Sequence, residues 1–397
     1  MFGHPVKRGV GKSEDLLEGL LAKVIIYRFR LDGARGGGHS NCLPLFRDIL
    51  RARVVLKEHT VSAENCWTIT WCCKIVYNCQ PQSITVINWK ASGNGEGAAV
   101  LTAPLALLTY WLLNLCNKLG VFRELHPLEP GNCHLIKGIE YGSEDINILP
   151  GGLALISSGL KYQSLHSFAP DQPGQILLVD LNKPVLTAVE LRISRGFDVE
   201  SFNPHGLNTY IDEDGTVHVF VVNHMQHTST VEHFMFEEGQ NSLIHLKTIQ
   251  HKLLHSLNGI VALSSDSFFV TIDHYFSDEP LKTLAFVLDL PWCSVVYYSP
   301  SEVKEVATGF RVANGIDVSP DGRYIFIAET AAHNIHVMEI NTNNTLTPVK
   351  TLHVGTVPDN LKVDPKTGVV WIGCCPILWK LLFYNPENPP GSEVIRI

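Results

Sequence analysis

A repeat between residue 132 and the end of the chain constrains the fold more than any other feature. Four segments share one pattern, in which a polar residue leads into an apolar step, an acidic turn and a strand. Their leading positions are separated by 53, 56 and 46 residues, and they are His205, Asn258, Asn314 and Asn360. This period is close to the length of one four-stranded blade, so the sequence predicts a β-propeller.

The same pattern gives the expected blade boundaries. Blades are expected to begin at Glu144, Asn203, Asn258, Asn314 and Asp359. Turns rich in Asp and Gly, of the kind that joins the strands of a hairpin, follow three of these starts at 212–215, 319–322 and 364–368. A sixth blade is expected partly from residues beyond Ile397. The predicted fold is therefore an all-β, six-bladed β-propeller whose last blade is incomplete.

The first 131 residues do not share this pattern. Residues 97–117 carry no charged side chain and have the length of a membrane-spanning or signal-anchor helix, although a buried helix is the alternative. Residues 1–96 show no sustained helical or strand period, and we expect a poorly ordered extension there. The predicted domains are thus the extension 1–96, the hydrophobic helix 97–117 and the propeller 118–397.

Charge is distributed unevenly between these parts. Residues 132–397 carry 16 Lys and Arg against 29 Asp and Glu, whereas residues 1–131 carry 15 against 10. A nucleic acid is excluded as the main partner of such an acidic body, because phosphate binding requires a basic face. An acidic propeller suits cation binding better, although acidity also serves solubility.

Polar residues recur where each innermost strand begins, and in a propeller these positions converge on the central axis. Oxygen donors in this number suit Ca²⁺, which takes six to eight ligands in flexible geometry. A single Asn or Asp at a turn is more often a turn former than a ligand, so the prediction depends on all five blade starts being polar at once. The residues concerned are Glu144, Asp145, His205, Asn258, Asn314, Asp359 and Asn360.

A cation at this position could polarise a carbonyl or phosphoryl oxygen and stabilise the oxyanion that develops. Proton transfer then requires a base. His205 stands at a blade start and His224 ends the strand that follows, and imidazole titrates near neutral pH. The pair could activate water, one histidine directly and the other as a relay.

The motifs GIEYGSEDINILPGG, FNPHG, VVNH, ANGIDVSPDGRYIFIAE and ENPPGSEVIRI make the chain resemble the serum paraoxonase family from about Gly120 to Ile397. The resemblance implies a six-bladed propeller with two calcium ions that hydrolyses lactones, aryl esters and, in some members, organophosphate triesters. His205 and His224 match the proposed catalytic dyad, and Asp359 is a competing base or nucleophile. The implied ligands of the catalytic calcium are Glu144, Asn258, Asn314, Asp359 and Asn360.

The resemblance also shows where the chain departs from the family. Asp145 and the carbonyl of Leu207 match ligands of a structural calcium, but Gly259 stands where the family has an aspartate, which weakens that ion. Cys133 matches a cysteine whose disulfide partner lies beyond the end of this chain. Cys374 matches a free thiol. Asn343 begins a glycosylation sequon that agrees with a family position.

Together these features predict a calcium-dependent hydrolase of lactones and esters that is secreted or membrane-anchored. Residues 97–117 are expected to contact a lipid, lipoprotein or membrane surface. Two alternatives stay open at this point: a catalytically impaired truncated isoform, and a propeller that only binds lipid or protein. Stabilisation by calcium would count against a protein-binding platform.

Overall fold

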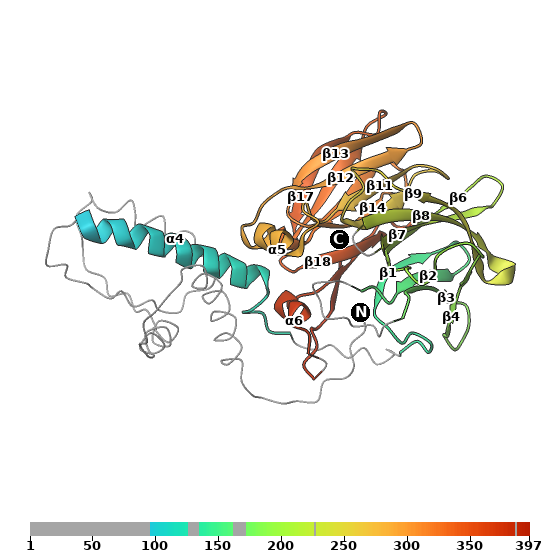
Figure 1. Cartoon of the computed structure of the whole chain (residues 1–397), viewed down its shortest axis with the longest axis horizontal. Coiled ribbons are helices and arrows are strands. Elements are labelled where there is room, and N and C mark those ends of the chain that lie inside the picture. The colour runs from blue at the N-terminus through green and yellow to red at the C-terminus, as the bar shows by residue number, and fades with distance from the viewer. Residues whose placement is uncertain (1–95, 126–134, 162–171, 226–227, 386) are drawn as a thin grey trace. The chain divides into compact units, whose positions relative to one another are not determined.

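The computed structural model describes residues 96–125, 135–161, 172–225, 228–385 and 387–397 (Figure 1). The predicted extension at 1–96 lies outside these residues except for its last position. The chain divides into two compact units, and all the sheets belong to the unit that contains Leu108–Ile397.

Helix α4 (Glu96–Lys118) occupies the uncharged run and contains Pro104. Near its end, the Trp111 indole donates a hydrogen bond of 3.1 Å to the carbonyl oxygen of Val287, and Lys118 pairs with Asp289. These contacts attach the end of α4 to the region of α5 (Glu279–Val287). Within the described part of the chain, no helix combines the length and the hydropathy needed to cross a membrane.

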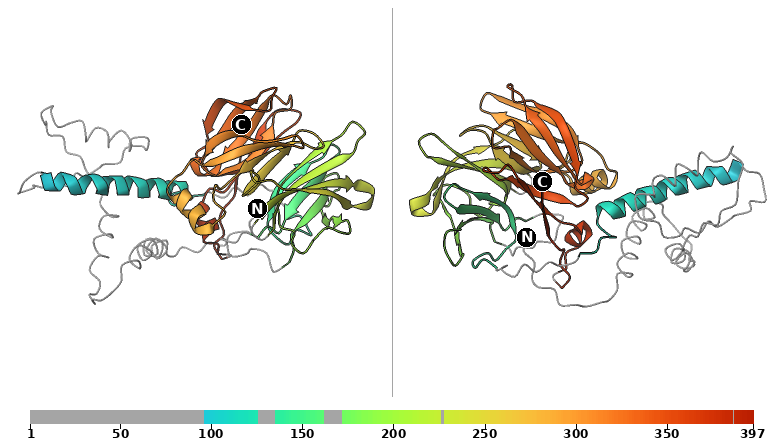
Figure 2. Two further views of the ribbon diagram at one scale, coloured as in Figure 1. Left: turned by 45° about the horizontal axis from the view of Figure 1, so that its top comes forward. Right: turned by 180° about the vertical axis from the view of Figure 1, so that it is seen from behind.

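The propeller unit is built from five sheets that follow one another in chain order (Figures 1 and 2). The first contains β1 (Ser143–Ile148), β2 (Leu153–Ser158), β3 (Gln175–Asp180) and β4 (Ala188–Glu190). The second contains β5 (Arg192–Ile193), β6 (Pro204–Ile211), β7 (Val217–Met225), β8 (Thr228–Glu237) and β9 (Ser242–Ile249), with the short η2 (Glu238–Gln240) between the last two. Only the pairing of β5 with β9 is parallel in these two sheets.

The remaining three sheets are antiparallel throughout. The third contains β10 (Leu257–Ala262), β11 (Phe268–Ile272), β12 (Cys293–Ser299) and β13 (Glu302–Phe310). The fourth contains β14 (Ala313–Val318), β15 (Tyr324–Glu329), β16 (Asn334–Ile340) and β17 (Leu346–His353), with η3 (Thr330–Ala332) after β15. The fifth contains β18 (Pro358–Val363), β19 (Val370–Cys374) and β20 (Glu393–Arg396), with α6 (Leu378–Leu382) before its last strand.

The predicted blade starts agree with the innermost strands to within one residue. Asn258, Asn314 and Asp359 are the second residues of β10, β14 and β18, respectively, and Asn203 directly precedes β6. The innermost strands are neighbours in chain order, since β1 contacts β6, β6 contacts β10, β10 contacts β14 and β14 contacts β18. Five blades are thereby confirmed. The sixth blade stays a prediction.

Local sequence explains the hairpins. The predicted turns at 212–215, 319–322 and 364–368 join the first two strands of their blades, and each ends in a glycine with positive φ that donates a hydrogen bond back across the turn. Large apolar side chains then fill the space between adjacent sheets. Phe234 and Leu243 belong to the layer between the first two blades, and Phe220 and Phe268 to the next. This packing fixes where each innermost strand delivers its polar residues.

Candidate active site on the propeller axis

Three innermost strands bring together residues that are far apart in the sequence. The Glu144 Oε1 atom lies 3.0 Å from His205 Nε2, which links the first blade to the second. Asn360 of the fifth blade donates through Nδ2 to the carbonyl oxygen of Glu144 at 2.8 Å and to its Oε1 at 3.0 Å. The first and last described blades therefore meet at Glu144.

Several buried oxygen atoms of the predicted ligands accept no hydrogen bond. Among the described residues, Glu144 Oε2, Asn258 Oδ1 and Asn314 Oδ1 have no hydrogen-bond partner. A buried polar atom left unpaired costs about 1 to 3 kcal/mol, so three of them from three blades require compensation. A hard cation such as Ca²⁺ would supply it, because carboxylate and amide oxygens are its preferred ligands.

Asp359 completes the set of acceptors predicted for this ion. Burial, followed by the charge of Glu144, raises the pKa of the Asp359 carboxyl to about 6. Such a shift reflects two neighbouring carboxylates with little compensating positive charge. Among the described residues, no group of three or more His, Cys, Asp and Glu side chains could hold a metal ion. The predicted set differs from such a group because three of its five members are asparagines.

His205 and His224 form a buried pair. His205 Nδ1 lies 2.8 Å from His224 Nε2, and His224 Nδ1 lies 3.0 Å from the Ser229 hydroxyl. Burial lowers the pKa of His205, but Glu144 outweighs it and leaves that pKa raised. Burial and the charge of His205 lower the pKa of His224 to about 3. The pair therefore holds at most one added proton, and His205 carries it.

Asp273 is a functional candidate that the sequence analysis missed. Its Oδ2 atom accepts from Asn258 Nδ2 at 3.4 Å, and its Oδ1 atom lies 2.7 Å from His274 Nδ1. The Asp273 carboxylate thus orients the Asn258 amide, whose Oδ1 atom has no hydrogen-bond partner among the described residues. Asp273 directly follows β11 and His224 lies one residue before the end of β7, so alignment of the second strands of the blades would have identified Asp273. Ser229 offered no such signal, because it lies on a third strand.

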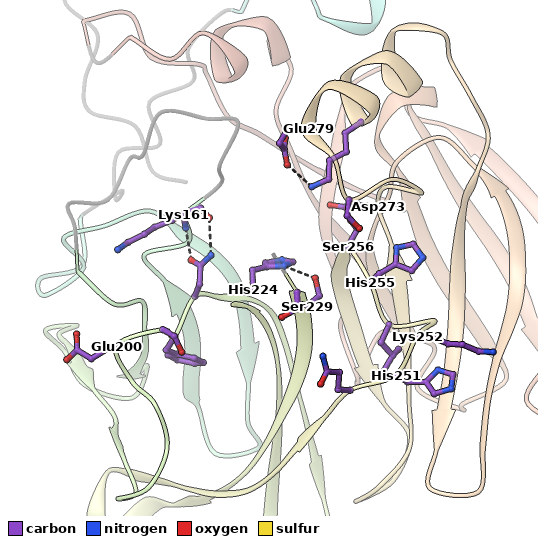
Figure 3. Close-up of a pocket in the computed structure, with 18 residues that line it drawn as sticks. Lys161, Glu200, His224, Ser229, His251, Lys252, His255, Ser256, Asp273 and Glu279 are labelled. Atoms are coloured by element: carbon purple, nitrogen blue, oxygen red, sulfur yellow. Dashed lines mark hydrogen bonds and ion pairs between the residues drawn. The ribbon is translucent and has the colours of Figure 1, made fainter. Parts of the chain in front are cut away.

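A pocket of about 630 Å³ opens beside the histidine pair. His224, Ser229 and Asp273 line it, and Figure 3 shows them between the second and third blades. Lys161 and Lys252 lie among the other lining residues. Because His224 lines the pocket and is bonded to buried His205, it connects the axis to a space that a small molecule could enter.

The residues predicted for the second calcium ion are arranged differently. The Asp145 carboxylate accepts from the backbone N–H of Leu207 at 2.9 Å through Oδ2. Lys362 Nζ lies 3.6 Å from Asp145 Oδ1 and donates to the carbonyl oxygen of Leu207 at 3.4 Å. Gly259 has no side chain and therefore contributes no side-chain ligand to a metal ion. The two remaining ligands thus contact an ammonium group, and the residues present do not fit a second calcium ion.

The other predicted sites lie away from the axis or outside the described residues. Asn343 is exposed in the turn between β16 and β17, where its Oδ1 accepts from the Thr345 hydroxyl at 2.7 Å. Cys133 lies outside the described residues. Cys374 is a free thiol, as predicted, and no disulfide occurs among the cysteines of the described segments, which also include Cys116, Cys293 and Cys375.

Comparison with known proteins places the chain. The family model of arylesterases matches residues 124–397, and the chain belongs to this family. It is 59% identical over 305 residues to serum paraoxonase/arylesterase 2 of Gallus gallus and 56% identical over 305 residues to that of Homo sapiens, which covers 77% of this chain and 86% of each relative. Serum paraoxonase/lactonase 3 of Rattus norvegicus is 56% identical over 298 residues, covering 75% of this chain and 84% of its own.

Proposed function

We propose that this chain is a calcium-dependent hydrolase of lactones and aryl esters, with organophosphate triesters as further candidate substrates. Membership of the arylesterase family supports ester hydrolysis. The observation that carries the calcium requirement is the group of unpaired buried oxygens Glu144 Oε2, Asn258 Oδ1 and Asn314 Oδ1. With Asp359 and Asn360 they supply oxygen donors from four blades.

Calcium bound by these residues would polarise the carbonyl oxygen of the ester and stabilise the oxyanion formed by water attack. The side chains have separate tasks. Glu144 and Asp359 would provide the negative charge that holds the ion. The Asn258 amide would present its oxygen because Asp273 accepts from its nitrogen at 3.4 Å.

The histidine pair would move the proton. His205 accepts a proton from the attacking water, because Glu144 at 3.0 Å favours its charged form. The 2.8 Å contact with His224 then offers a path toward the pocket. Ser229 fixes the orientation of His224 through its hydroxyl at 3.0 Å. Asp359 is the competing candidate for base or nucleophile, as the family resemblance implies.

The test is hydrolysis of phenyl acetate and of a simple lactone by the purified chain, before and after EDTA. Activity should disappear with EDTA and return with added calcium. His224→Gln should lower kcat by about 10² to 10⁴, the range for a positioned proton-transfer group, while calcium binding is retained. Hydrolysis that EDTA leaves unchanged would refute the role of the ion.

The secretory route and a lipid or membrane surface as partner of residues 97–117 are proposals of the same kind. The exposed turn that holds Asn343 is accessible to a glycosyltransferase, which supports the first. The apolar composition of residues 97–117 supports the second.

A further inference from the structure

Lys362 lies on an innermost strand, two residues after the proposed calcium ligand Asn360. Asp145 follows Glu144 in β1, Leu207 lies two residues after His205 in β6, and Lys362 lies two residues after Asn360 in β18. All three residues are on innermost strands, so the same convergence that gathers the calcium ligands brings these positions together.

The Lys362 ammonium contacts both oxygen groups at this position. Its Nζ atom lies 3.6 Å from Asp145 Oδ1 and 3.4 Å from the carbonyl oxygen of Leu207. Asp145 is buried, and its two oxygens also accept from the backbone N–H groups of Ile146 and Leu207. Asp317 is a half-buried carboxylate that accepts from the N–H of Val363, and the Lys362 charge opposes the effect of burial on its pKa.

A fourth innermost strand, β10, provides no side-chain ligand for a metal ion at its residue Gly259. Gly259 has no side chain, and a Cβ atom added there would lie 2.8 Å from the carbonyl oxygen of Asn314. The strands therefore approach too closely to admit a carboxylate without moving. A divalent ion would also have to displace the Lys362 ammonium or lie beside it, and like charges repel.

We propose that the ammonium group of Lys362 takes the place of the second calcium ion. The folded protein therefore binds one calcium ion instead of two. Asp145 is buried and Lys362 is its cationic partner, so removal of the Lys362 ammonium should be destabilising because it leaves a buried carboxylate without a counter-ion. This part of the scaffold therefore keeps its cation in the presence of a chelator. The inference rests on the proposed function for the first ion and extends it.

The first test counts calcium bound to the folded full chain by equilibrium dialysis and atomic spectroscopy. One ion per chain supports both this inference and the proposed function. Two tightly bound ions would overturn the inference and leave the proposed function standing. A folded chain that binds none would support the lysine assignment and refute the calcium dependence of the proposed function.

The second test compares Lys362→Ser with Lys366→Ser in EDTA. Lys366 is an exposed lysine in the turn after the same strand, so it serves as the matched control. Lys362→Ser should lower Tm by on the order of 10 °C relative to that control. Equal Tm values for the two variants would overturn the inference, and if Lys362→Ser does not fold, the ion count on the unsubstituted chain decides.

Discussion

The sharpest consequence of the proposed calcium site is that Asp359→Asn should stabilise the protein without calcium and abolish the further stabilisation that calcium gives the original chain. In the calcium-free protein, burial and the charge of Glu144 raise the pKa of Asp359 from 3.8 to about 6. The folded state therefore disfavours the ionised carboxyl. Its contribution to stability is present below pH 3.8 and is lost as the pH rises through about 6.

The size of this effect follows from the two pKa values. One pKa unit corresponds to about 1.4 kcal/mol, so the difference between 3.8 and about 6 is worth about 3 kcal/mol of unfolding free energy at pH 7.5. Asparagine has nearly the same shape and no charge. The substitution should therefore recover up to about 3 kcal/mol at pH 7.5 and little at pH 4, where most of the penalty is absent.

Urea denaturation in EDTA at both pH values measures this directly, with Asp198→Asn as an exposed control. In calcium at a hundred times its Kd, the original chain should gain about 2.7 kcal/mol from binding, and Asp359→Asn should lose that gain because it lacks a ligand carboxylate. If the unfolding free energies of the two chains in EDTA agree at pH 7.5, the electrostatic description of the axis is wrong.

Four further outcomes are expected. Ser229→Ala should lower kcat by about tenfold with unchanged KM and calcium affinity, because it removes the hydrogen bond that orients His224; an unchanged kcat would show that the bond has no positioning role. Single-turnover hydrolysis in H₂¹⁸O should place the label in the acid product if water attacks, whereas an unlabelled first product would assign Asp359 as nucleophile. Phe268→Ala should reduce the unfolding free energy by about 3 to 5 kcal/mol in urea denaturation, since the ring is fully buried between blades; a loss below about 1 kcal/mol would contradict the packing. Asn343→Gln should abolish an endoglycosidase-sensitive shift in mobility after expression in secretory cells, and the absence of any shift in the unsubstituted chain would argue against the sequon.

The sequence predicted the parts of the fold that repeat. Five blade starts and three hairpin turns agreed with the structure because the polar residue near each innermost strand recurs with the repeat, and three of the turns end in a glycine at positive φ. The positions of Glu144, Asn258 and Asn360 could be predicted for the same reason. The fold alone requires their convergence, although they are far apart in the chain.

Contacts made from outside the repeat could not be predicted in this way. Ser229 lies on the third strand of its blade, and the residues of third strands do not converge on the propeller axis as those of innermost strands do. The role of Lys362 depends on a side chain long enough to reach Asp145 in another blade, and nothing in the spacing of the repeat indicates that reach. The departure at Gly259 was visible in the sequence, but its compensation by Lys362 required the three-dimensional arrangement.

Crystals grown with terbium in place of calcium would test the central claim most directly, because anomalous scattering locates the ion. We predict one strong peak among the oxygens of Glu144, Asn258, Asn314, Asp359 and Asn360, and no peak between Asp145 and the carbonyl of Leu207. The absence of a peak among those five residues in a folded, metal-saturated crystal would contradict the account.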